Sequence, residues 1–120
     1  MSKTILIIDD DTRNIFALSA VLKAKGFDCL SATSAPGGID LLRSNEQIAI
    51  VLMDMMMPDM DGYEAIKIIK NDDAIASVPV IAVTARAMQG DEEKVLAVGA
   101  DAYVSKPVDV DKLLNVLSQY

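Results

Sequence analysis

The sequence predicts an α/β fold in which a mainly parallel sheet is covered by helices on both faces. Three short runs are apolar at every position: residues 5–8, 50–53 and 80–83. Strands that are buried on both faces have this pattern, whereas a strand with one solvent-facing side alternates apolar and polar residues. Stretches with helical spacing separate the runs, so that strand and helix alternate along the chain. With right-handed crossovers, this alternation gives a doubly wound α/β sandwich.

Two weaker runs, residues 28–31 and 102–104, bring the number of strand–helix repeats to five. Each expected helix carries an apolar stripe at helical spacing. The stripes are Ile15, Leu18, Val21 and Leu22; Ile39, Leu41 and Leu42; Tyr63, Ala65, Ile66 and Ile69; Val95, Leu96 and Val98; and Leu113, Leu114, Val116 and Leu117. Gly26 and Gly99 are expected to end the first and fourth helices, and Asp109 to cap the start of the fifth.

The length and composition indicate one folded domain spanning residues 1–120. A chain of 120 residues has the size of a single domain, and we see no linker or repeat that would divide it. Hydrophobic residues make up 52% of the chain and charged residues 24%, which excludes a disordered polar chain.

The charge and the rare residue types exclude several function classes. Eleven basic against 18 acidic residues give a net charge of −7, which argues against binding of nucleic acid or an anionic membrane. The absence of histidine excludes a Ser-His-Asp triad and a His-ligated zinc site. A single cysteine, Cys29, fits a reducing compartment. No apolar run is long enough for a membrane span and no signal peptide precedes the first strand, so we expect a cytoplasmic protein.

Polar side chains gather where the expected strands end. Asp9 and Asp10 follow the first strand, Asp54 the third, Thr84 the fourth and Lys106 the fifth. In doubly wound sheets the carboxyl ends of the strands form the ligand-binding edge. Carboxylates suit a hard cation such as Mg²⁺, while an ammonium and a hydroxyl suit phosphate oxygens. The edge is therefore equipped for a divalent cation and a phosphoryl group.

Each of these residues also has an ordinary structural explanation. An aspartate after a strand often caps the next helix, and we expect Asp11 to do so. Asp54 could serve a turn, although a carboxylate at the end of an apolar strand is costly without partners. Tyr103 could be a half-buried packing residue. Five methionines surround the same edge, and we interpret them as gap-filling side chains rather than soft-metal ligands. They are Met53, Met55, Met56, Met57 and Met60.

Taken in order, these segments resemble the receiver domain of bacterial two-component response regulators over essentially the whole chain. The matching motifs are residues 5–10, residues 51–54 with Met56-Met57-Pro58 and Asp61-Gly62, residues 83–85, residues 99–101 and residues 103–107. The resemblance implies a flavodoxin-like three-layer sandwich. Its five-stranded parallel sheet has the order 2-1-3-4-5 and is accompanied by five helices.

The resemblance also implies a role for each residue at the strand ends. Asp54 corresponds to the phosphoacceptor, and Asp9 and Asp10 to the acids that bind Mg²⁺ together with Asp54. The backbone carbonyl of Met56 corresponds to the remaining metal ligand. Lys106 corresponds to the cation that pairs with Asp54 and then with the phosphoryl oxygens.

Two further residues correspond to a conformational switch. The hydroxyl of Thr84 is expected to move to the phosphoryl group, and the ring of Tyr103 to swing inward with it. The bond between Lys106 and Pro107 is cis in the family. The face around Tyr103 would then bind an unknown downstream protein.

By resemblance, the chain is a signalling domain rather than an enzyme, with self-phosphotransfer and slow loss of its own phosphoryl group. The donor would be a phosphohistidine on a histidine kinase or a histidine phosphotransfer protein. Two alternatives stay open. One is a receiver-shaped interaction module that ignores phosphorylation. The other is an aspartate-nucleophile phosphatase of haloacid-dehalogenase type, although its DxDxT signature is absent.

Overall fold

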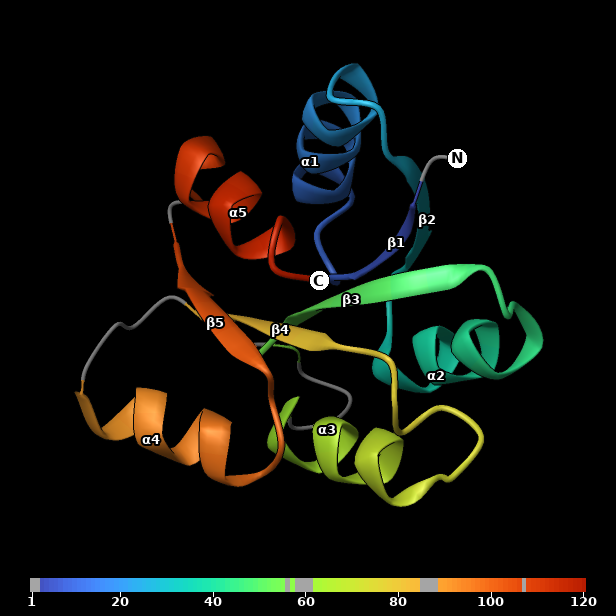
Figure 1. Ribbon diagram of the computed structural model, residues 1–120, viewed down its shortest axis with the longest axis vertical. Helices are drawn as coiled ribbons and strands as arrows, with labels where there is room; N and C mark the ends of the chain where they lie inside the picture. Colours follow the sequence, from blue (N-terminus) through green and yellow to red (C-terminus); the bar gives the residue numbers. More distant parts are fainter. Residues whose placement is uncertain (1–2, 56, 58–61, 85–88, 107) are drawn as a thin grey trace.

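A computed structural model describes residues 3–55, 57, 62–84, 89–106 and 108–120, and these form five strands and five helices in strict alternation (Figure 1). The strands are β1 (Thr4–Ile8), β2 (Asp28–Ala32), β3 (Ile48–Asp54), β4 (Val80–Thr84) and β5 (Ala102–Ser105). The helices are α1 (Thr12–Ala24), α2 (Ala35–Ser44), α3 (Gly62–Asn71), α4 (Gln89–Ala97) and α5 (Val110–Leu117).

The strands form one parallel sheet in the order β2-β1-β3-β4-β5. The predicted sheet order, parallel pairing and number of helices are therefore confirmed. β1 lies between β2 and β3. The first connection, from β1 to β2, runs to one side of β1, and the next connection, from β2 to β3, crosses back to its other side. This reversal is the topological switch point of the sheet.

Helices cover both faces of the sheet, which accounts for the wholly apolar strands. α1 and α5 lie on one face, and α2, α3 and α4 lie on the other (Figure 1). Successive residues of β1 point to opposite faces, so that Ile5 and Ile7 join the core under α1 and α5, while Leu6 and Ile8 join the core under the other helices. All five residues of β1 are buried.

The predicted helix ends are confirmed where they were named. The side chain of Asp11 accepts a hydrogen bond from the Arg13 N–H, and Asp109 accepts from the N–H groups of residues 111 and 112. Gly26 and Gly99 have φ angles of 95° and 113°, a left-handed conformation that ends a helix at little cost only for glycine.

The predicted stripe of the fourth helix was wrong in part. Val95 is buried, but Leu96 is 42% exposed because consecutive residues of a helix point about 100° apart. Val98 lies beyond the end of α4 at Ala97. No helix in the described ranges is both long and apolar enough to cross a lipid bilayer.

α2 approaches the sheet closely at Gly38. A Cβ atom at this position would lie far closer to Cδ1 of Ile8 than the van der Waals contact distance, and Ile8 is fully buried. The glycine therefore sets how near α2 lies to β1. The sequence pattern placed the helix but not this contact.

Candidate functional site

Two buried aspartates meet at the switch point because β1 and β3 are neighbours. Ile8 of β1 pairs with Met53 of β3, so the next residues along the two strands are Asp9 and Asp54. Asp9 is 4% exposed and Asp54 is 3% exposed. Parallel pairing thus brings together two carboxylates that are 45 positions apart in the chain.

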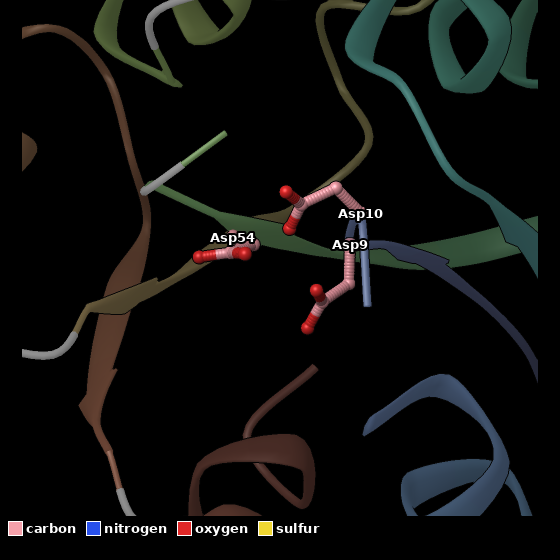
Figure 2. A group of neighbouring side chains, drawn as sticks. All are labelled: Asp9, Asp10 and Asp54. Carbon is pink, nitrogen blue, oxygen red and sulfur yellow. The ribbon is translucent and has the colours of Figure 1, made fainter. Parts of the chain in front are cut away.

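Asp10 completes a cluster of three acids (Figure 2). One carboxylate oxygen from each of Asp9, Asp10 and Asp54 lies within 4.8 Å of the others. Asp10 is exposed, whereas the other two are buried, so the cluster has one side open to solvent. The structure therefore brings together all three predicted acidic ligands.

Burial and like charge act together on Asp9. Loss of hydration raises the pKa of the Asp9 carboxyl, and the neighbouring Asp54 carboxylate raises this pKa further. The backbone N–H of Asp11, which donates to Asp9 Oδ1 at 2.9 Å, and the charge of Lys106 oppose the rise. The two carboxylates therefore repel each other, and a bound cation would offset this repulsion.

The Asp11 amide is a contributor that the sequence analysis missed. Asp11 was identified only as a helix cap, which it is. Its N–H also orients Asp9, because the turn from β1 into α1 directs this amide back toward the cluster. A backbone donor leaves no residue-type signal, so only the turn geometry could reveal it.

Lys106, which follows β5, places a positive charge beside Asp54. Its Nζ lies 3.2 Å from Asp54 Oδ1, and its side chain is 26% exposed. The Lys106 N–H donates to the Thr84 carbonyl at 2.7 Å, which fixes the start of the loop after β5. The predicted pairing of Lys106 with Asp54 is present in the structure.

Thr84 and Tyr103 lie on the two neighbouring strands β4 and β5. Thr84 ends β4, is buried, and lies opposite Ser105. Tyr103 lies opposite Ala82, and its half-buried ring packs against the core under α2, α3 and α4. Thr84 is therefore at the predicted edge, whereas Tyr103 lies within β5; the movement of both residues stays a prediction.

Two predicted contributors lie outside the described residues: Met56, whose carbonyl was expected to bind the metal, and Pro107, expected to follow a cis bond. The described methionines Met53, Met55 and Met57 are buried in the core, which supports their interpretation as gap-filling side chains.

The donor set fits a divalent oxygen-binding cation. Three carboxylates and one ammonium leave the cluster with excess negative charge, and two of the acids are shielded from water. Mg²⁺ binds to a small number of carboxylates and keeps several waters, which suits a cluster with one exposed side. The residues present could therefore hold such an ion.

The chain is similar to known proteins over nearly its whole length. The family model of the response regulator receiver domain matches residues 5–118. The polar-differentiation response regulators DivK of Brucella ovis and Brucella anthropi are each 34% identical over 120 residues, covering 100% of this chain and 97% of the relative.

Solved structures agree with these relatives. A CheY-like response regulator receiver domain protein from Methanospirillum hungatei JF-1 has a TM-score of 0.87 and 31% identity, covering 99% of this chain and 93% of that one. The receiver domain of sensor histidine kinase PA1611 from Pseudomonas aeruginosa PAO1 has a TM-score of 0.89 and 28% identity, covering 100% and 98%. That structure is described with a magnesium ion coordinated in its active site cleft.

The matched family model covers nearly the whole chain, and the relatives align with it from end to end. The sheet order and the acidic edge agree with this match. The chain therefore belongs to the response regulator receiver domains, the signalling domains of two-component systems.

Proposed function

We propose that this chain is a phosphoacceptor in a two-component phosphorelay and that Asp54 receives the phosphoryl group. The observation that carries the proposal is the position of Asp54. Its buried carboxylate belongs to one cluster with Asp9 and Asp10 and lies 3.2 Å from Lys106 Nζ. Phosphoryl transfer depends on positioning and on neutralising the phosphoryl oxygens, and this cluster is arranged for both.

The donor must come from another protein or from a small molecule, because the chain has no histidine. We infer a phosphohistidine on a histidine kinase or phosphotransfer protein. An oxygen of Asp54 forms the new O–P bond while the P–N bond of the donor breaks. The imidazole nitrogen keeps the electron pair and takes up a proton, and Asp54 becomes an acyl phosphate.

Lys106, the acidic residues and the Asp11 amide have different roles in this transfer. Lys106 moves from the Asp54 carboxylate to a phosphoryl oxygen, because the phosphoryl group carries more negative charge than the carboxylate it replaces. Asp9, Asp10, Asp54 and, by resemblance, the Met56 carbonyl would hold Mg²⁺, which would supply further positive charge to the phosphoryl oxygens. The Asp11 amide holds Asp9 in place.

The signal is a population shift. We infer that the phosphoryl group favours the state in which the Thr84 hydroxyl and the Tyr103 ring point inward. The surface formed by α4, β5 and α5 then changes shape and binds a downstream protein. The acyl phosphate is lost slowly by hydrolysis, which resets the domain.

The test is to incubate the chain with Mg²⁺ and a small acyl phosphate and to measure its intact mass. We expect the gain of one phosphoryl group, its release by hydroxylamine, and no gain for Asp54→Asn. The matched control is Asp73→Asn, which removes an exposed acid of the α3–β4 loop and should leave labelling unchanged.

A second measurement separates the alternatives. Beryllofluoride with Mg²⁺ should shift the NMR signals of Asp54, Thr84 and Tyr103. Absence of both labelling and shifts would support the interaction module, and turnover of small phosphate esters would support the phosphatase.

A further inference from the structure

A cavity of about 280 Å³ lies between α1 and α5 on one face of the sheet. Its floor comes from three adjacent strands and its walls from the two helices, and apart from Asn14 of α1 both are apolar. The apolar residues include Ile7, Leu52 and Val83 on the floor, Leu18 and Val21 on α1, and Val110 on α5. The cavity therefore offers a hydrocarbon surface directly beneath the acidic edge.

Charged side chains border the same cavity at one end. Asp9, Asp54 and Lys106 line it, and Asp10 belongs to the same acidic cluster. The Asp9 carboxylate points toward the side of the sheet where α1 and α5 lie (Figure 2). Three carboxylates against one ammonium give this end of the cavity a net negative charge.

The size and the charge together define a ligand class. Apolar cavities of about 150 Å³ bind benzene, so the present volume accepts one ring with a short linker. An anion would be repelled by the carboxylates, and a neutral molecule would gain no ion pair. A cation at the end of the linker would gain charge-assisted hydrogen bonds to carboxylates, two of which are buried.

We propose that this cavity binds a small amphipathic cation of the arylalkylammonium class. The ring lies between α1 and α5, and the ammonium lies among the carboxylates of Asp9, Asp10 and Asp54. Because the ammonium and a divalent cation need the same oxygens, the two ligands exclude each other. Occupation of these oxygens would also keep the domain from phosphorylation; this regulatory consequence rests on the proposed function, whereas the binding itself does not.

The test is an NMR titration of the metal-free chain with 2-phenylethylammonium. We expect saturable shifts at the methyl groups of Leu18, Val21 and Val110, and binding about tenfold tighter than that of 2-phenylethanol. The anion 3-phenylpropionate and the ring-free ethylammonium should bind more weakly still. Saturating Mg²⁺ should weaken 2-phenylethylammonium about tenfold, and NaCl of equal ionic strength should weaken it less.

Two variants separate the ring site from the charge site. Val21→Phe should fill the cavity and weaken the probe about tenfold while the Mg²⁺ affinity stays unchanged. If Val21→Phe does not fold, Val110→Leu serves the same purpose. Asp9→Asn should reduce the preference for the ammonium over the alcohol.

Equal binding of cation and anion, shifts that map away from α1 and α5, or no saturable binding would each overturn the proposal. The beryllofluoride response is recorded separately on the same sample. The phosphoacceptor function can thus fail without affecting this result, and the reverse also holds.

Discussion

The ammonium of Lys106 lies 3.2 Å from Oδ1 of Asp54, which joins the loop after β5 to the end of β3 across the intervening strand β4. Asp54 is almost wholly buried, and its neighbours Asp9 and Asp10 carry the same charge. A single cation thus faces three acids within the described part of the site. The folded state is expected to respond strongly to any change in this charge balance.

Removing a carboxylate from the cluster should stabilise the metal-free protein. Two like charges about 4 Å apart repel by roughly 4 kcal/mol at an effective dielectric constant of 20, and Lys106 offsets part of this. We expect Asp9→Asn or Asp54→Asn to raise the free energy of unfolding by about 1–2 kcal/mol in urea without divalent ions. The charge-matched control is Asp28→Asn, because Asp28 begins β2 and so lies at the edge of the sheet opposite the acidic cluster.

With Mg²⁺ present, the wild type should become more stable than the variants, because the ion binds to the folded wild type and has fewer carboxylate ligands in the variants. If chelator lowers the melting temperature of the wild type no more than that of the variants, the acids do not share a metal.

Removing the cation should have the opposite effect. Lys106→Met leaves the acids without their positive neighbour, and we expect a loss of about 1–3 kcal/mol in the free energy of unfolding without Mg²⁺. Mg²⁺ should recover more of this loss than NaCl of equal ionic strength, because NaCl only screens the charges. Equal recovery by the two salts would contradict a cation-binding cluster.

The ion pair between α2 and the α3–β4 loop should give a pH-dependent contribution to stability. Arg43 Nε donates to Asp72 Oδ2 at 2.8 Å, and this hydrogen bond lowers the pKa of the Asp72 carboxyl, assisted by the Ala74 N–H. A depressed pKa in the folded state stabilises the fold above the unfolded pKa, and this stabilisation is lost as the pH falls through the folded value.

Asp72→Asn should therefore be slightly less stable than the wild type at pH 7, and the difference should vanish in acid. Urea unfolding between pH 7 and pH 2 measures it. Asp73→Asn removes the same charge without breaking the pair with Arg43. A constant difference between Asp72→Asn and wild type at all pH values would refute the assignment.

The close approach of α2 to β1 predicts an unusual glycine effect. Alanine is normally better than glycine inside a helix by about 1 kcal/mol. At Gly38 the added Cβ would overlap the buried Ile8 side chain, so we expect Gly38→Ala to destabilise by about 1–2 kcal/mol. The neighbouring Gly37→Ala meets only Ser34 Oγ at 3.0 Å and should cost less.

A smaller side chain at residue 8 tests whether this overlap causes the loss of stability. Ile8→Ala removes both carbons that the new Cβ would overlap, Cδ1 and Cγ1, so the double variant should lose less stability than the sum of the two single variants. Additive effects of the two substitutions in thermal or urea unfolding would show that the contact does not limit the packing.

The acidic edge was predictable because parallel strands align their carboxyl ends. Once the runs ending before Asp9 and at Asp54 were identified as strands of one sheet, their carboxylates had to lie at one edge. The resemblance added the pairing of Asp54 with Lys106 and the strand order. The Asp11 amide and the cavity between α1 and α5 carried no such signal, because they depend on a turn and on the gap between two helices.

By itself the sequence determined the alternation of strands and helices, the two-sided burial of the sheet and the residue types at its edge. These follow from local periodicity and from the cost of placing charge on an apolar strand. Only the tertiary structure decided how close Lys106, Asp54 and Asp9 lie, which side chains of each helix reach the core, and how near Gly38 brings α2 to Ile8. Those distances depend on how side chains from separate elements fill a shared volume, and no pattern along one chain records that.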